Sequence, residues 1–267
     1  MTRFLRDRTR RAAALALVLV APFSATAAWA AACPTSADPQ ALVSQYKGQA
    51  EIEEASTAGV TLTFTENPLF GSDGLPPVAE RLPEQPLIIL PYAECGKYGG
   101  TIEGTSRAPT SGTSDILSWR QAVLVRIADD LTTILPNVAR SWTWNDNYSA
   151  ITFELRKGHK WSDGQPFTSA DVVFFFEDIV QNKDLNPETT TEYGVNPHAK
   201  AIDDTHVEVS FESPFPGFLT YLATSGSYFS TFAPRHFFEK FMPQYNPNAD
   251  ADAKAAGFED WKTWFTN

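Results

Sequence analysis

The sequence predicts a mixed α/β domain, and three segments of its second half carry that prediction. Residues 141–144 and 151–155 alternate polar and apolar side chains on either side of an Asn/Asp turn, which is typical of a β-hairpin. Residues 172–181 are apolar on most sides, which predicts a buried helix. Residues 205–212 alternate again and predict another strand. Its inward-facing side chains should be Val207, Val209 and Phe211.

The start of the buried helix is marked by a capping box. In Thr168-Ser169-Ala170-Asp171, the threonine hydroxyl can accept a hydrogen bond from the first turn, and the Asp171 carboxylate can accept one from the Thr168 amide. We therefore expect the helix to begin directly after Thr168.

The remaining elements follow from shorter patterns. Apolar residues recur at helical spacing over 116–131, which predicts a helix that Pro136 closes off from the next region. The other expected elements are strands at 60–64 and 99–102, helical turns at 77–82, and helices beginning at 218 and covering 261–265.

The first thirty residues resemble a secretory signal peptide. A basic stretch that ends at Arg11 precedes the apolar run 12–23, and Ala28-Trp29-Ala30 has the A-x-A form of a cleavage site. No later segment approaches the length of a membrane-spanning helix. We expect residues 1–30 to be removed and the mature protein to be exported to the periplasm, by the general or the twin-arginine route.

The acidic composition excludes partners that carry many negative charges. The formal net charge of the whole chain is −11, from 21 basic and 32 acidic residues. Residues 1–30 hold five arginines and one aspartate, so the remainder has 16 − 31 = −15. Such a chain repels nucleic acids and anionic lipid surfaces.

A proline-rich preamble at 31–95 holds both cysteines of the chain, Cys33 and Cys95. In an exported protein, two cysteines predict one disulfide bond. The alternative is a lipid-anchored Cys33, because residues 30–33 resemble a lipobox, although Ala30 stands where leucine is usual.

No motif in the sequence predicts catalysis, a cofactor or a metal site. His159, Ser162 and Asp163 lie within one turn, where a nucleophile, its base and an orienting acid can seldom face each other. The histidines have no metal-ligand spacing. The paired acids at 129–130 and 203–204 are interpreted as solvated. A secreted hydrolase with two separated carboxylates stays open as an alternative.

Three stretches of the sequence carry a resemblance to a known family. They are Gly99-Gly100-Thr101, residues 135–142 (LPNVARSW) and residues 155–177 (LRKGHKWSDGQPFTSADVVFFFE). Together they resemble the family 5 extracellular solute-binding proteins of ABC importers, over about residues 96–238. Ser169 stands where that family usually has alanine.

The resemblance implies a periplasmic-binding-protein-like fold of type II, cluster C. Residues 96–267 would form the first lobe, with a mixed sheet and helices, and most of the second lobe would lie beyond Asn267. The implied function is to bind peptides and deliver them to a membrane permease, without enzymatic activity or a cofactor, as a monomer. Oligosaccharide, opine and metal chelate are alternative ligands on the same fold.

The resemblance makes residues 155–177 part of the scaffold and places ligand contacts in loops. Loop aromatic residues beside small polar residues suit a ligand-facing role. The expected contacts are Thr110, Ser111, Thr113, Tyr193, Ser225, Gly226 and Tyr228.

Overall fold

The computed structural model describes most of the second half of the chain and short stretches of the first. The described residues are 51–52, 66–68, 74–84, 86–89, 98–101, 103, 122–128, 130–187, 193–225 and 231–267.

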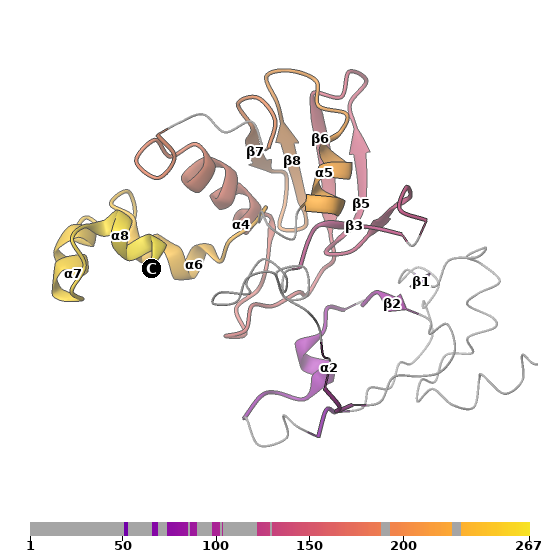
Figure 1. Cartoon of the computed structure of the whole chain (residues 1–267), viewed down its shortest axis with the longest axis horizontal. Helices are drawn as coiled ribbons and strands as arrows, with labels where there is room; N and C mark the ends of the chain where they lie inside the picture. The colour runs from indigo at the N-terminus through magenta and orange to yellow at the C-terminus, as the bar shows by residue number, and fades with distance from the viewer. Residues whose placement is uncertain are drawn as a thin grey trace, which may run out of the picture.

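An antiparallel four-stranded sheet organises the domain (Figure 1). Its strand order is β5 (Ala139–Trp144), β6 (Ala150–Leu155), β8 (His206–Ser210) and β7 (His198–Ala201). Strands β5 and β6 form the predicted hairpin, with Trp142 opposite Phe153. Strand β8 confirms the strand expected at 205–212.

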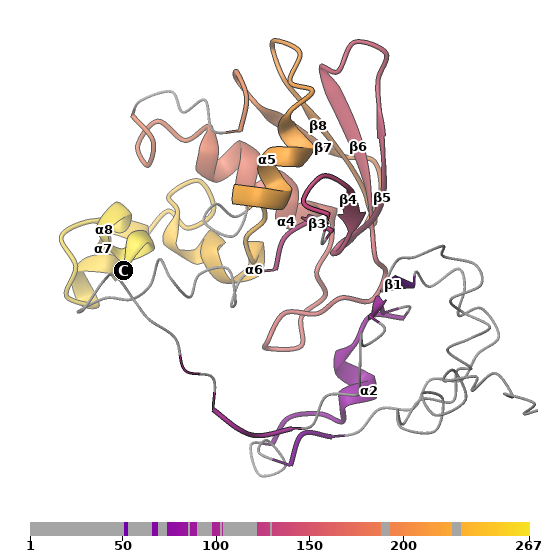
Figure 2. The same ribbon diagram turned by 45° about the vertical axis from the view of Figure 1, so that its right-hand side comes forward.

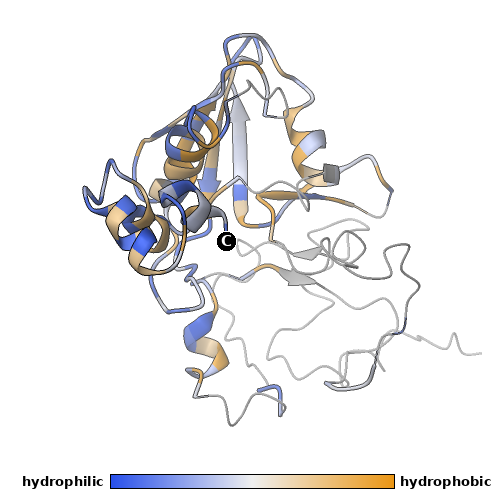
Figure 3. Cartoon of the chain, turned by 60° about the vertical axis from the view of Figure 1, so that its left-hand side comes forward, coloured by the Kyte–Doolittle hydropathy of each residue, from blue (hydrophilic) through white to orange (hydrophobic). Residues whose placement is uncertain are grey.

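One face of this sheet is buried and the other is polar. Ile151, Phe153 and Val209 are fully buried, whereas their neighbours Thr152 and Glu208 lie on the outer face. Helix α5 (Phe218–Ser225) covers the inner face (Figure 2). The ring centroid of Phe218 lies 6.4 Å from that of Phe153. Figure 3 shows the same alternation as orange and blue segments along the strands and helices.

The predicted buried helix is present and begins at its capping box. Helix α4 (Ser169–Val173) follows Thr168, whose hydroxyl accepts from Ala170 N at 3.3 Å and whose amide donates to Asp171 Oδ2 at 2.9 Å. The helix continues as η2 (Phe174–Val180), a wider π-helical segment. Three consecutive phenylalanines can be buried there because the helix contacts the rest of the core on several sides. They are Phe174, Phe175 and Phe176.

The prediction of a helix over 116–131 is wrong for the residues of that range that the structure describes. Strand β3 (Val125–Ile127) pairs there with β4 (Ile134–Pro136), so Pro136 is part of a strand. Asp130 closes the turn between them by accepting from the amides of Thr132 and Thr133, each at 2.8 Å. The pairing partner, which helical spacing does not reveal, decides the conformation. Residues 116–121 lie outside the described part.

A second correction concerns the start of the predicted lobe. Gly99 and Gly100 have φ values of 104° and 86°, so the strand expected at 99–102 is absent from the described residues there. These angles lie in the region that glycine adopts readily and other residues do not. Ile102 itself lies outside the described part.

Short helices lie in the preamble and at the C-terminal end of the described chain. The predicted turns at 77–82 appear as α2 (Val78–Arg81), near the short pair β1 (Glu51–Ile52) and β2 (Ile88–Ile89). The C-terminal part contains α6 (Arg235–Phe238), η3 (Glu239–Phe241), α7 (Ala249–Ala255) and α8 (Trp261–Thr266). Helix α8 confirms the prediction at 261–265. Among the described residues, none of the helices has the length and apolar character that crossing a membrane requires.

Candidate functional site

Two of the predicted ligand contacts have a described position. Tyr193 is described fully, and Ser225 is described as the last residue of α5. The other five contacts, Thr110, Ser111, Thr113, Gly226 and Tyr228, lie outside the described residues, as do Cys33, Cys95 and the strand expected at 60–64.

Tyr193 lies in a cluster of aromatic rings rather than on an open loop surface. Its side chain is 6% exposed. The ring centroids of Phe175, Phe176 and Tyr221 lie 5.4, 5.8 and 6.4 Å from its own, all at steep interplanar angles. Such edge-to-face contacts fix the orientation of the ring. A ligand contact by Tyr193 stays a prediction, and it would involve a ring already held in place.

Gly194 shapes the backbone beside Tyr193. Its φ is 91°, and a Cβ atom there would lie 2.7 Å from Phe211 Cδ1 and 3.0 Å from Phe215 Cδ1. Only glycine combines this conformation with such a close approach of two rings. The backbone at Gly194 therefore packs closely against the rings of Phe211 and Phe215.

Tyr221 connects the two described contacts, and the sequence reasoning missed it. Tyr221 touches Tyr193 and precedes Ser225 by four residues on α5. The spacing along the predicted helix was the available signal. The structure thus brings α5 close to Tyr193 at Tyr221.

The residues His159, Ser162 and Asp163 form no catalytic arrangement. Asp163 Oδ2 lies 2.7 Å from Nε2 of His236, and the Gln165 amide and His236 lower the pKa of its carboxyl. The ring of His159 packs edge-to-face against Phe167, and burial lowers the pKa of this histidine, with a smaller contribution from Arg156. His159 and Asp163 therefore have separate structural partners, and neither faces the other.

Asp130, Asp203 and Asp204 are exposed, which agrees with the interpretation of the paired acids as solvated, and Asp129 lies outside the described residues. Asp130 lies in the turn of β3 and β4, where hydrogen bonds from Thr133 hold its pKa well below the usual range. Asp203 accepts from the amides of Thr205 and His206, each at 2.8 Å. The His206 ring and these amides lower the pKa of the Asp203 carboxyl. Both carboxylates are exposed and occupied by local hydrogen bonds.

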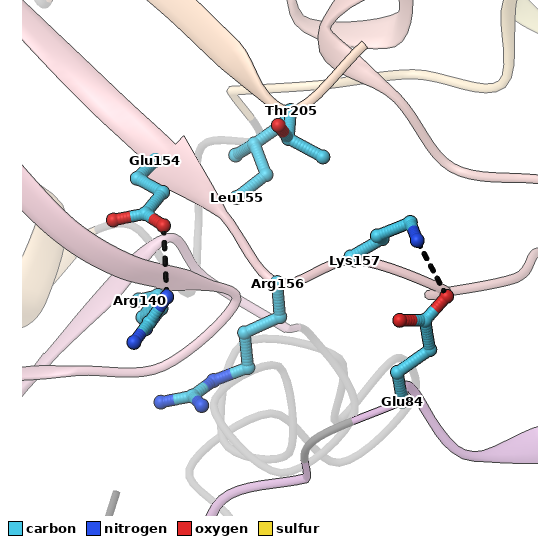
Figure 4. Close-up of a pocket in the computed structure, with 7 residues that line it drawn as sticks. All are labelled: Glu84, Arg140, Glu154, Leu155, Arg156, Lys157 and Thr205. Atoms are coloured by element: carbon cyan, nitrogen blue, oxygen red, sulfur yellow. Dashed lines mark hydrogen bonds and ion pairs between the residues drawn. The ribbon is translucent and has the colours of Figure 1, made fainter. Parts of the chain in front are cut away.

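Two small hollows lie on the surface of the described residues. The first, of about 190 Å³, lies between the end of β6 and residue Glu84 (Figure 4). The second, of about 290 Å³, lies between the turn before α4 and the helix α6. Ligand pockets usually measure about 300–1,000 Å³ and are mostly apolar, whereas charged groups line both hollows. The first is lined by Glu84, Arg140, Glu154, Leu155, Arg156, Lys157 and Thr205.

Among the described residues, no group of three or more His, Cys, Asp or Glu side chains could hold a metal ion. The described part therefore contains an ordered aromatic cluster at Tyr193 and two charged hollows.

Comparison with known families gives this geometry a context. Residues 133–263 match the model of the bacterial extracellular solute-binding proteins, family 5, middle region. Over these residues, the chain belongs to that family. Family 5 proteins bind solutes for ABC importers, as the resemblance predicted.

The solved structures confirm the predicted fold class. An oligopeptide-binding protein OppA superposes with a TM-score of 0.68 and 32% identity, covering 79% of this chain and 34% of that one. MelB of Agrobacterium fabrum, solved with stachyose, gives a TM-score of 0.52 and 28% identity, covering 85% and 34%.

Similar proteins differ in the solutes that their names state. The periplasmic alpha-galactoside-binding protein of Rhizobium meliloti is 33% identical over 193 residues, which is 64% of this chain and 28% of the relative. The oligopeptide-binding protein OppA of Escherichia coli is 30% identical over 143 residues, or 47% and 26%. The chain thus spans between a quarter and a third of these relatives' lengths.

Proposed function

We propose that this chain is part of the periplasmic substrate-binding component of an ABC importer, and that it binds oligopeptides and delivers them to a membrane permease. The superposition on an oligopeptide-binding protein, with a TM-score of 0.68, carries the choice of peptides. The protein would act as a monomer and would catalyse no reaction.

A second candidate ligand is an α-linked galactose oligosaccharide. The alpha-galactoside-binding relative aligns with 64% of this chain, compared with 47% for the E. coli peptide-binding protein. MelB, which was solved with stachyose, supports the same candidate. Aromatic rings pack against sugar faces as readily as against peptide side chains.

The ligand contacts are proposed at the residues expected from the sequence. The aromatic cluster at Tyr193 supports this proposal, because a ring held by Phe175, Phe176 and Tyr221 loses little conformational entropy when a ligand binds. The loop contacts are Thr110, Ser111, Thr113, Ser225, Gly226 and Tyr228.

The organisation of the chain follows from the same proposal. Residues 1–30 would direct export, residues 31–95 would form a preamble with a Cys33–Cys95 disulfide, and residues 96–267 would belong to the first lobe. Non-reducing mass spectrometry checks the bond. Two free thiols, or a lipid on Cys33, would contradict it.

A thermal-shift and calorimetry series tests the ligand class. Tri- and tetrapeptides should raise the melting temperature, whereas free amino acids serve as a control. Stachyose is compared with lactose, whose galactose has the β linkage. Stabilisation by stachyose alone would replace the first candidate by the second, and no response to either class would contradict both. Hydrolysis of a stabilising ligand would favour a secreted hydrolase.

A Tyr193→Phe substitution tests the site, because it keeps the ring and removes the hydroxyl. We expect weaker binding of the stabilising ligand, and urea unfolding of the same variant separates this loss from any change in stability. Tyr245→Phe, on the other side of η2, is the control. Unchanged affinity would remove Tyr193 from the site.

A further inference from the structure

Hydrogen bonds and an ion pair within the preamble hold the segment around helix α2. The Glu66 carboxylate accepts from the Val78 amide at the start of α2 and pairs with Arg81 at 2.8 Å. Arg81 also donates to the Pro76 carbonyl at 2.8 Å. Because the Glu66 carboxylate neutralises the charge of Arg81, the carboxylates of Glu80 and Glu84 give the surface of the segment a negative charge.

This segment lies against the turn that follows β6. The Glu84 amide donates to the Lys157 carbonyl at 3.0 Å, and the Lys157 ammonium lies 3.0 Å from Glu84 Oε1 (Figure 4). Nearby, the Lys160 ammonium donates to the Glu80 carbonyl at 2.7 Å. One backbone hydrogen bond and two lysines thus join segments about eighty positions apart.

Gly158 allows the closest part of this contact. Its φ is 88°, and a Cβ atom there would lie 3.0 Å from Glu84 N, 3.1 Å from Glu84 Cγ and 3.6 Å from Pro83 Cα. Any side chain at this position would push against the backbone of the segment. The glycine therefore both turns the chain and leaves room for Glu84.

The turn is a rigid support because it is bonded to the sheet. Arg156 is 3% exposed, its amide donates to the Val138 carbonyl at 3.0 Å, and its Nε donates to the Asn137 carbonyl at 2.7 Å. The Leu155 amide donates to the Thr205 carbonyl at 2.7 Å. The surface that faces Glu84 is thus held by hydrogen bonds that do not involve the segment.

We propose that the turn 156–160 is a docking surface for an acidic segment, and that its occupant is residues 80–84 of the same chain. Lys157 supplies the charge that pairs with Glu84, Lys160 donates to the Glu80 carbonyl, the Lys157 carbonyl supplies the acceptor, and Gly158 supplies the space. This contact ties the preamble to the first lobe independently of any solute. The proposed solute-binding function gives residues 156–160 no role, whereas this contact gives them one.

Hydrogen exchange at the Glu84 amide tests the contact, and two glycines allow a matched comparison. Gly158→Ala should speed exchange across residues 80–84 at least about fivefold, because the new methyl group displaces the segment. Gly164→Ala is the control, since Gly164 has a nearly equal φ of 87° but no atom within 4 Å of its would-be Cβ. Equal exchange in the two folded variants would overturn the proposal.

Charge reversal provides a second test that adds no side chain to the turn. Glu84→Lys and Lys157→Glu should each speed exchange of the segment about two- to fivefold, as expected for an exposed ion pair. The double variant should restore most of the protection. Failure of the double variant to recover would refute the ion pair as part of the contact.

The occupant can be identified by dilution. Protection that is independent of protein concentration supports docking within one chain. Protection that falls on dilution would mean that a second copy supplies the segment, and would overturn the proposed occupant.

Discussion

Asp171 holds the start of α4 to a segment more than sixty residues away, so its removal should destabilise the fold strongly. The side chain is 4% exposed, and its two oxygens accept from Thr168 N at 2.9 Å and Arg235 N at 3.0 Å. Its own carbonyl accepts from Ala233 N at 3.2 Å. One residue therefore caps a helix and anchors the chain that leads into α6.

The size of the effect follows from the two side-chain hydrogen bonds. A hydrogen bond to a charged group contributes about 1.5–3 kcal/mol, and a buried amide left without a partner costs about 1–3 kcal/mol. We expect Asp171→Ala to lower the free energy of unfolding by about 3–4 kcal/mol, partly offset by water that reaches the two amides. Asp171→Asn keeps one acceptor oxygen and should cost about half as much.

Urea unfolding, followed by circular dichroism and tryptophan fluorescence, measures both variants. Asp184→Ala is the control, because this exposed side chain makes no described hydrogen bond and should change stability by less than about 0.5 kcal/mol. Equal slopes against urea are required for the comparison. A cost for Asp171→Ala no larger than that of Asp184→Ala would refute the anchoring role.

Two further substitutions test the core. Gly194→Ala should lower the free energy of unfolding by about 2–4 kcal/mol, because its Cβ would lie 2.7 Å from the Phe211 ring. Gly257→Ala is the control, since Gly257 has the same φ of 91° but lies in open space. This control should cost only the backbone strain of about 1–2 kcal/mol. Burial lowers the pKa of His159, so stability should be complete above about pH 6.5 and fall as the pH drops through the folded-state pKa. Thermal unfolding from pH 8 to 5 should show a weaker pH dependence in His159→Gln; an unchanged profile would contradict this assignment.

Local patterns predicted the elements whose conformation local physics decides. Alternation over 141–144 and 151–155 specified the hairpin, because a half-buried sheet imposes a period of two. The capping box specified the start of α4, because its two hydrogen bonds lie within four residues. The helix prediction failed over residues 122–131, because the conformation of β3 depends on its pairing with β4. That pairing is a tertiary contact, which local spacing does not show.

The site was less predictable for a related reason. The position of Tyr193 after the buried helix was available from the sequence, but the ring is fixed by Tyr221, which comes from α5. That contact depends on the placement of α5 next to the residues that follow η2, and α5 comes later in the chain. A loop residue thus becomes a core residue through the arrangement of distant elements, which spacing alone does not encode.

The segment 157–171 also shows why a motif can be specific without being catalytic. Its lysine at 157 contacts Glu84 of the preamble, its Asp163 contacts His236 of α6, and its Asp171 accepts from the amide of Arg235, the first residue of α6. The preamble and α6 are therefore both held by side chains within fifteen consecutive residues. The histidine at 159 packs against Phe167 and the aspartate at 163 pairs with His236, so both have structural contacts within the described part of the chain. This segment therefore joins the preamble, the turn before α4 and the start of α6 through contacts that need no catalytic role.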